Sequence, residues 1–134
     1  MQLSAKKISE ILDAKLVVGS PDAVGNSVFT DTRKPGANGI FIALRGENFN
    51  GDQFAGKALE EGASIAIVQE WSGGEIAEGK AVIEVPETLF ALQRLAHWWR
   101  SQLDIPVICI TGSNGKTSTK DFAAAILSQA FNVN

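Results

Sequence analysis

The chain has 134 residues, and its 12 lysine and arginine residues against 15 aspartate and glutamate residues give a formal net charge of −3. This length suffices for one hydrophobic core, and the 45% share of hydrophobic residues excludes an intrinsically disordered protein. The acidic balance argues against a protein that binds nucleic acid through an overall positive field. No segment approaches the roughly 20 apolar residues of a membrane-spanning helix, so we expect neither a nucleic-acid partner nor a membrane.

The cysteine content predicts the cellular compartment. Cys109 is the only cysteine, so an internal disulfide cannot form, and a reducing cytoplasmic setting is expected. Residues 1–12 mix charged with apolar side chains, a pattern unlike that of a secretory signal peptide. Because isoleucines flank Cys109, we interpret it as a small buried hydrophobic residue rather than a nucleophile.

The first 85 residues alternate between predicted helices and strands, which is typical of a small α/β domain. Ser4 is a candidate N-cap for a helix over residues 4–13, and a second helical pattern within residues 52–62 ends at Gly62. The glycine-rich segment 71–79 is expected to be a surface loop. Five apolar runs bounded by turn-forming residues predict strands at 15–18, 27–30, 39–44, 64–68 and 80–85.

The clearest helical pattern follows Pro86. Apolar residues recur every three or four positions from Thr88 to Leu103 and predict a helix with one buried face. We expect Trp99 to lie on this buried face. His97 is expected to be a surface residue.

A strand, a glycine-containing loop and a helix then follow in direct succession. Residues 105–111 form a nearly continuous β-branched run, the pattern of a strand buried on both faces. The loop 112–117 leads into a predicted helix over residues 118–131, whose apolar side chains recur on one face. This order of elements is the one that holds a phosphate group in nucleotide-binding proteins.

The loop also has the residues that such a site needs. Gly112 and Gly115 allow backbone amides to turn toward an anion, and the following helix N-terminus adds partial positive charge. Lys116 is the candidate catalytic residue, contacting the β- and γ-phosphates of ATP, and the Thr117 hydroxyl is the candidate Mg²⁺ ligand. A plain glycine turn with an exposed lysine is the alternative interpretation. The common pattern has a further glycine where this chain has Ile110, so the loop is of the shorter G-x-x-G-K-T form.

The sequence TGSNGKTSTKD, from Thr111 to Asp121, resembles the ATP-binding signature of the Mur ligases, the ATP-dependent amide ligases of peptidoglycan synthesis. Its ending, Ser118-Thr-Lys-Asp121, is similar to the MurF branch of that family, whereas the MurE branch usually lacks this lysine. Folylpolyglutamate synthases fit less well, because they usually carry Lys-Gly-Ser where this chain has Lys-Thr-Ser.

The resemblance extends through the N-terminal residues. The segments that carry it are Thr30–Arg33, Pro35–Gly36, Gly39–Gly46, Asn50–Asp52 and Phe54–Ala63. They are similar to the domain that binds the UDP-sugar in MurE and MurF. The resemblance therefore implies an α/β domain over residues 1–85 that binds UDP-MurNAc-tripeptide. Residues 86–134 would then be the first helix, strand, phosphate-binding loop and helix of the central ATP-binding domain.

The resemblance to the MurF branch implies a specific reaction. Enzymes of this branch use ATP and Mg²⁺ to phosphorylate the terminal carboxylate of UDP-MurNAc-tripeptide, and the amine of D-Ala-D-Ala then attacks the acyl phosphate. A third domain brings the dipeptide. The full-length enzyme is expected to be a monomer.

The resemblance also implies the residues of both sites. Those matching the uridine motif are Thr30, Thr32 and Arg33, and those matching the loop beside the diphosphate and sugar are Glu47, Asn48 and Phe49. Those matching the nucleotide signature are Thr111, Gly112, Ser113, Asn114, Gly115, Lys116, Thr117 and Ser118.

Taken without the resemblance, the uridine motif has a second interpretation. Thr30–Arg33 is also consistent with a turn closed by an Asx hydrogen bond and a solvated arginine. An anionic ligand on a chain of negative net charge needs a local positive group. Arg33, Lys34 and Arg45 are the candidates.

Two classes of function stay open. The chain is either part of a MurF-type ligase, with a MurE-type UDP-MurNAc-dipeptide ligase as the nearest alternative, or a non-catalytic module that binds a nucleotide or UDP-sugar. Because the acidic Mg²⁺ ligands of such ATPases lie on later strands, we expect these 134 residues alone to be inactive. Exposed apolar edges of the incomplete ATP-binding segment are expected to promote self-association.

Overall fold

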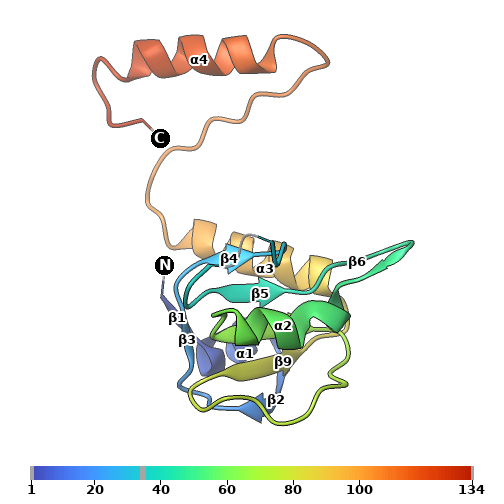
Figure 1. The fold of residues 1–134 in the computed structure, drawn as a ribbon. Helices are drawn as coiled ribbons and strands as arrows, with labels where there is room; N and C mark the ends of the chain where they lie inside the picture. Colours follow the sequence, from blue (N-terminus) through green and yellow to red (C-terminus); the bar gives the residue numbers. More distant parts are fainter. Residues whose placement is uncertain (1, 34–35, 134) are drawn as a thin grey trace. The chain divides into compact units, whose positions relative to one another are not determined.

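In the computed structural model, which describes residues 2–33 and 36–133, the apolar runs of the sequence form a five-stranded sheet (Figure 1). Its strand order is β2-β9-β8-β5-β4. The pairs β9-β8, β8-β5 and β5-β4 are parallel, and β2 is antiparallel to β9. The strands are β2 Lys15–Gly19, β4 Val28–Phe29, β5 Ile40–Ile42, β8 Ile65–Val68 and β9 Ala81–Glu84. All five predicted strands are therefore confirmed.

Helices cover both faces of this sheet. Along β8, Ile65 and Ile67 belong to one buried cluster, which also contains apolar residues of α1 (Ala5–Leu12) and α3 (Thr88–Ser101). Ala66 and Val68 point to the opposite face and belong to a second cluster with α2 (Ala55–Glu60). Side chains alternate along a strand in this way, so a continuous apolar run predicts burial on both faces. The predicted α/β class is confirmed.

The helix termini follow from local sequence. Ser4 caps α1, since its hydroxyl accepts a hydrogen bond from the backbone N–H of Lys7 at 3.2 Å. Glu87 caps α3, because its two carboxylate oxygens each accept a backbone N–H at 2.7 Å, from Leu89 and Phe90. The turn η1 (Gly51–Phe54) leads directly into α2. The helices predicted within 4–13, 52–62 and 88–103 are confirmed.

Four short strands were not predicted from the sequence. Strand β1 (Leu3–Ser4) pairs with β3 (Val24–Gly25), and β6 (Arg45–Gly46) pairs with β7 (Phe49–Asn50), both antiparallel. Figure 1 shows the β6–β7 hairpin extending away from the sheet. Pairs of two residues have no periodicity that a sequence pattern can reveal.

Helix α3 packs with the N-terminal residues. The chain divides into two compact units, Met1–Leu103 and Asp104–Asn134, and Ala91 and Leu95 of α3 belong to the same buried cluster as Ile8 of α1. The assignment of residues 86–134 to the ATP-binding domain is about which residues bind ATP, and it stays a prediction. By packing, the boundary between the units follows Leu103.

The two adjacent tryptophans of α3 correct one prediction. Trp99 was expected in the core and is exposed, whereas Trp98 is partly buried against the core cluster. The helical period allows either residue beside Leu95, and the position of α1 selects Trp98. His97 is exposed, as predicted.

Residues 104–133 of the second unit contain one helix, α4 (Lys116–Leu127), which begins two residues before the predicted start. The strand predicted at 105–111 is wrong, because the structure has extended coil there and Ile108 is 64% exposed. Cys109 is exposed as well, so its predicted burial is also wrong. A strand needs a neighbouring strand for its backbone hydrogen bonds, and residues 104–133 as described contain none that could pair with residues 105–111.

No helix among the described residues is both long enough and apolar enough to cross a lipid bilayer.

Candidate substrate edge and nucleotide loop

The predicted substrate residues follow the carboxyl ends of neighbouring parallel strands. Thr30–Arg33 comes directly after β4, and the β6–β7 hairpin follows β5. Gln69 and Glu70 follow β8, the central strand. Since β4, β5 and β8 are parallel, their carboxyl ends lie at one edge of the sheet. This is where open α/β sheets bind their ligands, and we call it the carboxyl edge.

At the carboxyl edge, Thr30–Arg33 forms a turn held by Asp31. The Asp31 carboxylate accepts the backbone N–H of Arg33 at 2.9 Å, which is the Asx hydrogen bond of the alternative interpretation. It also accepts the Arg33 guanidinium, through Nε at 2.9 Å and Nη2 at 2.7 Å. The hydrogen bond and negative charge of Asp31 raise the pKa of Arg33. Thr30 is exposed and Thr32 half-buried, so both positions are compatible with a ligand contact.

The hairpin carries the other predicted substrate residues at its tip. Glu47 and Asn48 form the turn, and Phe49 begins β7 with 54% of its surface exposed. The Phe49 ring stacks on Phe54 of η1, with ring centroids 5.5 Å apart and planes inclined by 12°. The tip therefore presents an aromatic ring and polar turn residues to solvent.

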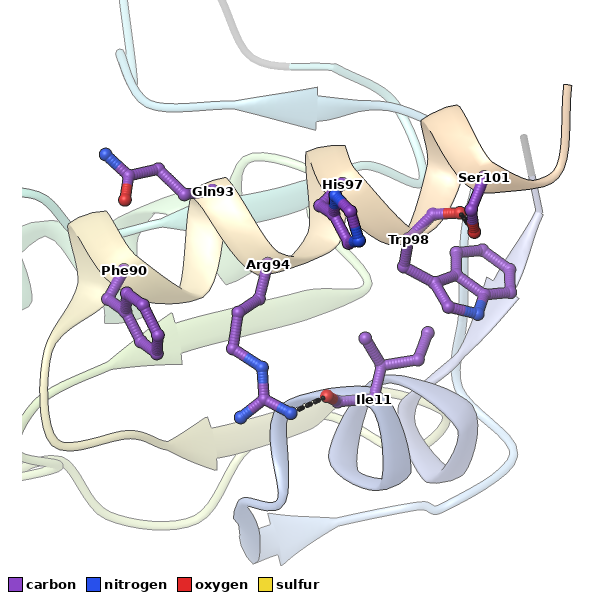
Figure 2. A pocket seen from close by; sticks show the side chains of 7 residues that line it. All are labelled: Ile11, Phe90, Gln93, Arg94, His97, Trp98 and Ser101. Carbon is purple, nitrogen blue, oxygen red and sulfur yellow. Dashed lines mark hydrogen bonds between the residues drawn. The ribbon is translucent and has the colours of Figure 1, made fainter.

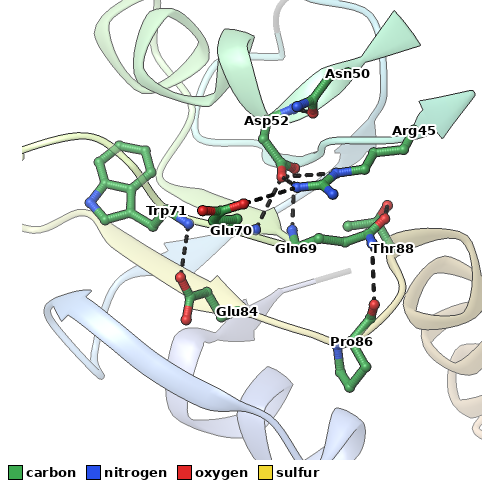
Figure 3. A network of polar contacts seen from close by, with 9 residues as sticks. All are labelled: Arg45, Asn50, Asp52, Gln69, Glu70, Trp71, Glu84, Pro86 and Thr88. Atoms are coloured by element: carbon green, nitrogen blue, oxygen red, sulfur yellow. Dashed lines mark hydrogen bonds and ion pairs between the residues drawn. The ribbon is translucent and has the colours of Figure 1, made fainter. Parts of the chain in front are cut away.

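A buried carboxylate, Asp52, fixes the base of the hairpin (Figure 3). Its Oδ2 accepts Arg45 Nε at 3.1 Å and also Arg45 Nη2. The backbone N–H groups of Gln69 and Glu70 donate to the same carboxylate at 3.2 and 3.0 Å. Its side chain is only 6% exposed. Asp52 thus joins the hairpin to the end of the central strand.

Gln69 extends these contacts to the start of α3. Its Nε2 donates to the Pro86 carbonyl at 3.2 Å, and its Oε1 accepts the hydroxyl of the buried Thr88 at 3.4 Å. Sequence reasoning missed Asp52 and Gln69 as site residues. The signal available for Asp52 was the segment Asn50–Asp52, which already carried the family resemblance.

The three positively charged residues that could bind an anionic ligand differ in exposure and in their ion pairs. Arg33 is 87% exposed and pairs with the neighbouring Asp31 at 2.7 Å. Arg45 is held by Asp52 and lies 3.8 Å from the Glu70 carboxylate, so its charge is compensated. Lys34 lies outside the described residues. Both described candidates are thus paired with a carboxylate, and Arg33 is the more exposed of the two.

The nucleotide loop has the backbone that its glycines predict. Gly112 and Gly115 have φ angles of 150° and 75°, which side-chain-bearing residues rarely adopt. Gly115 is the N-cap of α4, so the backbone N–H groups of the first helical turn are free of intrahelical partners. Lys116 donates from its ammonium group to the Gly112 carbonyl. Residues 111–118, including the candidate Mg²⁺ ligand Thr117, are all exposed.

Two hollows accompany these sites. One of about 250 Å³ lies within the second unit, lined by Ile108, Ile110, Lys116, Thr117 and Lys120.

The other, of about 540 Å³, lies between α1 and α3 (Figure 2) and is lined by Ile11, Phe90, Gln93, Arg94, His97, Trp98 and Ser101. Arg94 donates there to the Ile11 and Leu12 carbonyls at 2.6 and 2.9 Å, so it caps the end of α1. Residues 2–33 and 36–133 contain no cluster of three metal-ligating side chains.

Comparison with known proteins decides the family. No family model matches the chain. The UDP-N-acetylmuramoyl-tripeptide–D-alanyl-D-alanine ligase of Synechocystis is 45% identical over 114 residues, covering 85% of this chain and 25% of the relative. That of Bacillus subtilis is 40% identical over 131 residues, covering 97% and 28%. The chain belongs to the MurF-type Mur ligases.

Solved structures agree with this assignment to the MurF-type Mur ligases. A crystal structure of MurF from Acinetobacter baumannii superimposes with a TM-score of 0.85 at 29% identity, covering 98% of this chain and 28% of that one. The chain thus spans about a quarter of the length of the MurF relatives it matches. The predicted family is confirmed, and so is the preference for MurF over MurE.

Proposed function

We propose that the chain supplies the UDP-sugar-binding residues and the nucleotide loop of an ATP-dependent ligase. This ligase adds D-Ala-D-Ala to UDP-MurNAc-tripeptide in peptidoglycan precursor synthesis, in the cytoplasm. The observation that carries the proposal is the 45% identity to a relative named for this reaction. The absence of a membrane-spanning helix among the described residues is compatible with the location.

The carboxyl edge is the proposed binding site for UDP-MurNAc-tripeptide. Thr30 and Thr32 offer hydroxyl groups to the uridine, and Arg33 offers a guanidinium whose fork suits an anionic ligand. Glu47, Asn48 and Phe49 reach the diphosphate and sugar from the hairpin tip. The position of both segments after parallel strands of one sheet supports this assignment.

The nucleotide loop is the proposed site for ATP and Mg²⁺. Its residues fit the group: two glycines open the backbone, a helix N-terminus faces the loop and Lys116 supplies the positive charge. The Thr117 hydroxyl is the residue that would hold Mg²⁺. Bound ATP supplies the phosphoryl group that activates the tripeptide carboxylate. The chain's own part is to bind the phosphates through the backbone N–H groups of the loop and through Lys116.

Replacing Arg33 tests the substrate assignment. Arg33→Ala is expected to weaken binding of UDP-MurNAc-tripeptide by about 10-fold to 100-fold, since a charge-assisted hydrogen bond contributes about 1.5–3 kcal/mol. Isothermal titration calorimetry of the chain measures this change. Lys57→Ala is the matched control, because it removes one exposed positive charge from α2. Equal losses in the two variants would mean that only net charge matters and would contradict the assignment.

The exposed apolar residues of α4 form the basis of a proposal about assembly. Phe122 is 72% exposed and Ile126 lies one turn further along the same helix. We expect the chain to self-associate through this face, because association would remove these exposed apolar side chains from water. Sedimentation velocity should show a larger species that Phe122→Asp shifts toward the monomer. The control Leu89→Asp, at an exposed position of α3, should leave the proportion of the larger species unchanged. A monomeric wild-type chain would refute the expectation.

A further inference from the structure

The β6–β7 hairpin cannot hold its own tip in place. Its strands contribute two residues each, paired as Arg45 with Asn50 and Gly46 with Phe49, and all four are exposed. A two-stranded ribbon of this length is marginal in water without other contacts. Apart from the stacking of Phe49 on Phe54, the orientation of the tip residues therefore depends on contacts at the base of the hairpin.

Asp52 supplies these contacts. Arg45 of β6 donates to its carboxylate from one side, and the backbone N–H groups of Gln69 and Glu70 donate from the other (Figure 3). Asn50 of β7 accepts the Asp52 N–H at 3.1 Å through its side chain. Both strands of the hairpin are thereby tied to the end of β8.

Because Asp52 is buried, its hydrogen bonds hold the hairpin at a defined angle to the end of β8. A buried carboxylate without partners is costly, so all its donors are required at once. Arg45 fixes the angle because a guanidinium donates in a planar fork. The carboxylates of Asp52 and, at 3.8 Å, of Glu70 compensate the positive charge of Arg45. Arg45 then acts through the geometry of the hairpin rather than by direct contact.

We propose that Asp52 is a positioning residue for the sugar nucleotide. With Arg45 it holds the hairpin so that Glu47, Asn48 and Phe49 face the diphosphate and sugar at the carboxyl edge. This inference rests on the proposed substrate. The inference assigns to Asp52 an indirect role. Asp52 makes no contact with the substrate, and it determines whether residues 47–49 can contact the diphosphate and sugar.

The test compares two ligands on the same chain. Asp52→Asn keeps the shape of the side chain and removes its charge and one acceptor. It is expected to weaken binding of UDP-MurNAc-tripeptide about tenfold, because the tip residues must then be ordered on binding. Binding of UMP, which lacks the second phosphate and the MurNAc-tripeptide, should change less than about twofold. Calorimetry gives both affinities, and ¹⁵N relaxation should show increased mobility at residues 47–49.

Two further variants separate positioning from stability. Glu87→Gln is the matched control, since Glu87 also accepts two backbone N–H groups, and these belong to α3 rather than to the hairpin or β8. It should leave both affinities unchanged. Arg45→Lys keeps the charge and loses the fork, so it should reproduce the Asp52→Asn result even if the latter variant folds poorly.

The outcomes distinguish the two proposals. If the wild-type chain binds neither ligand, the proposed function fails. If the wild-type chain binds and Arg45→Lys weakens both ligands equally, or neither, the positioning role of Asp52 is wrong and the proposed function stands. A selective loss for UDP-MurNAc-tripeptide supports the inference.

Discussion

Lys116→Ala is expected to reduce the affinity of the chain for MgATP by about 10-fold to 100-fold, which corresponds to the loss of a charge-assisted hydrogen bond. Lys116 begins α4 and lies over the Gly112 carbonyl, where its ammonium group can reach a bound phosphate. A titration followed by the amide resonances of residues 111–118 measures the change. The same resonances report whether the nucleotide binds at the predicted loop.

Lys120→Ala is the control for this experiment. Lys120 lines the same hollow as Lys116 but pairs with Asp121 at 3.1 Å. An exposed ion pair of this kind contributes at most about 1 kcal/mol, so this variant should lose less than about fivefold in affinity. Equal losses would show that the loop attracts nucleotide by charge alone. No nucleotide effect in the wild-type chain would contradict the proposed ATP site.

Ile67→Ala is expected to lower the free energy of unfolding of the first unit by about 2–5 kcal/mol. Ile67 is completely buried in β8, the central strand, and belongs to the cluster that α1 and α3 cover. Removing its side chain loses apolar burial and leaves a cavity that neighbouring strands and helices cannot fill. Denaturation by urea, followed by circular dichroism, measures the change.

Ile108→Ala provides the comparison, because it makes the same chemical change at an exposed position. Ile108 is in the extended coil of the second unit, and its substitution should change stability by less than about 0.5 kcal/mol. If both variants were equally destabilised, Ile108 would be buried in solution. The original prediction of a strand at 105–111 would then regain support.

The sheet could be predicted because its strands are complete in this chain. Each of the five apolar runs has its neighbours within residues 15–84, so periodicity and burial agree. Residues 105–111 carry an equally strong pattern, yet they remain in coil, since the described second unit offers no strand to pair with them. A β-branched run indicates that a segment favours a buried strand. Whether a strand forms also depends on neighbouring strands, which the local sequence does not specify.

The candidate site could be predicted only in part. The family resemblance suggested the segments Thr30–Arg33 and 47–49, whereas the glycine-lysine-threonine pattern of 111–118 pointed to a phosphate site by itself. Ligand contact at all three segments stays a prediction. The role of Asp52 could not be read from the sequence, since its partners lie 7, 17 and 18 residues away and meet only through the sheet order. The ion pair between Arg45 and Asp52 could not be read from the sequence for the same reason, because it is a tertiary contact.

The central claim is that the carboxyl edge binds UDP-MurNAc-tripeptide. Titrating the ¹⁵N-labelled chain with this compound tests it most directly. The account predicts saturable amide shifts concentrated at Thr30–Arg33 and at residues 47–49, with little change in the α1–α3 hollow around Trp98. Shifts confined to that hollow, or no shifts at millimolar ligand, would contradict it.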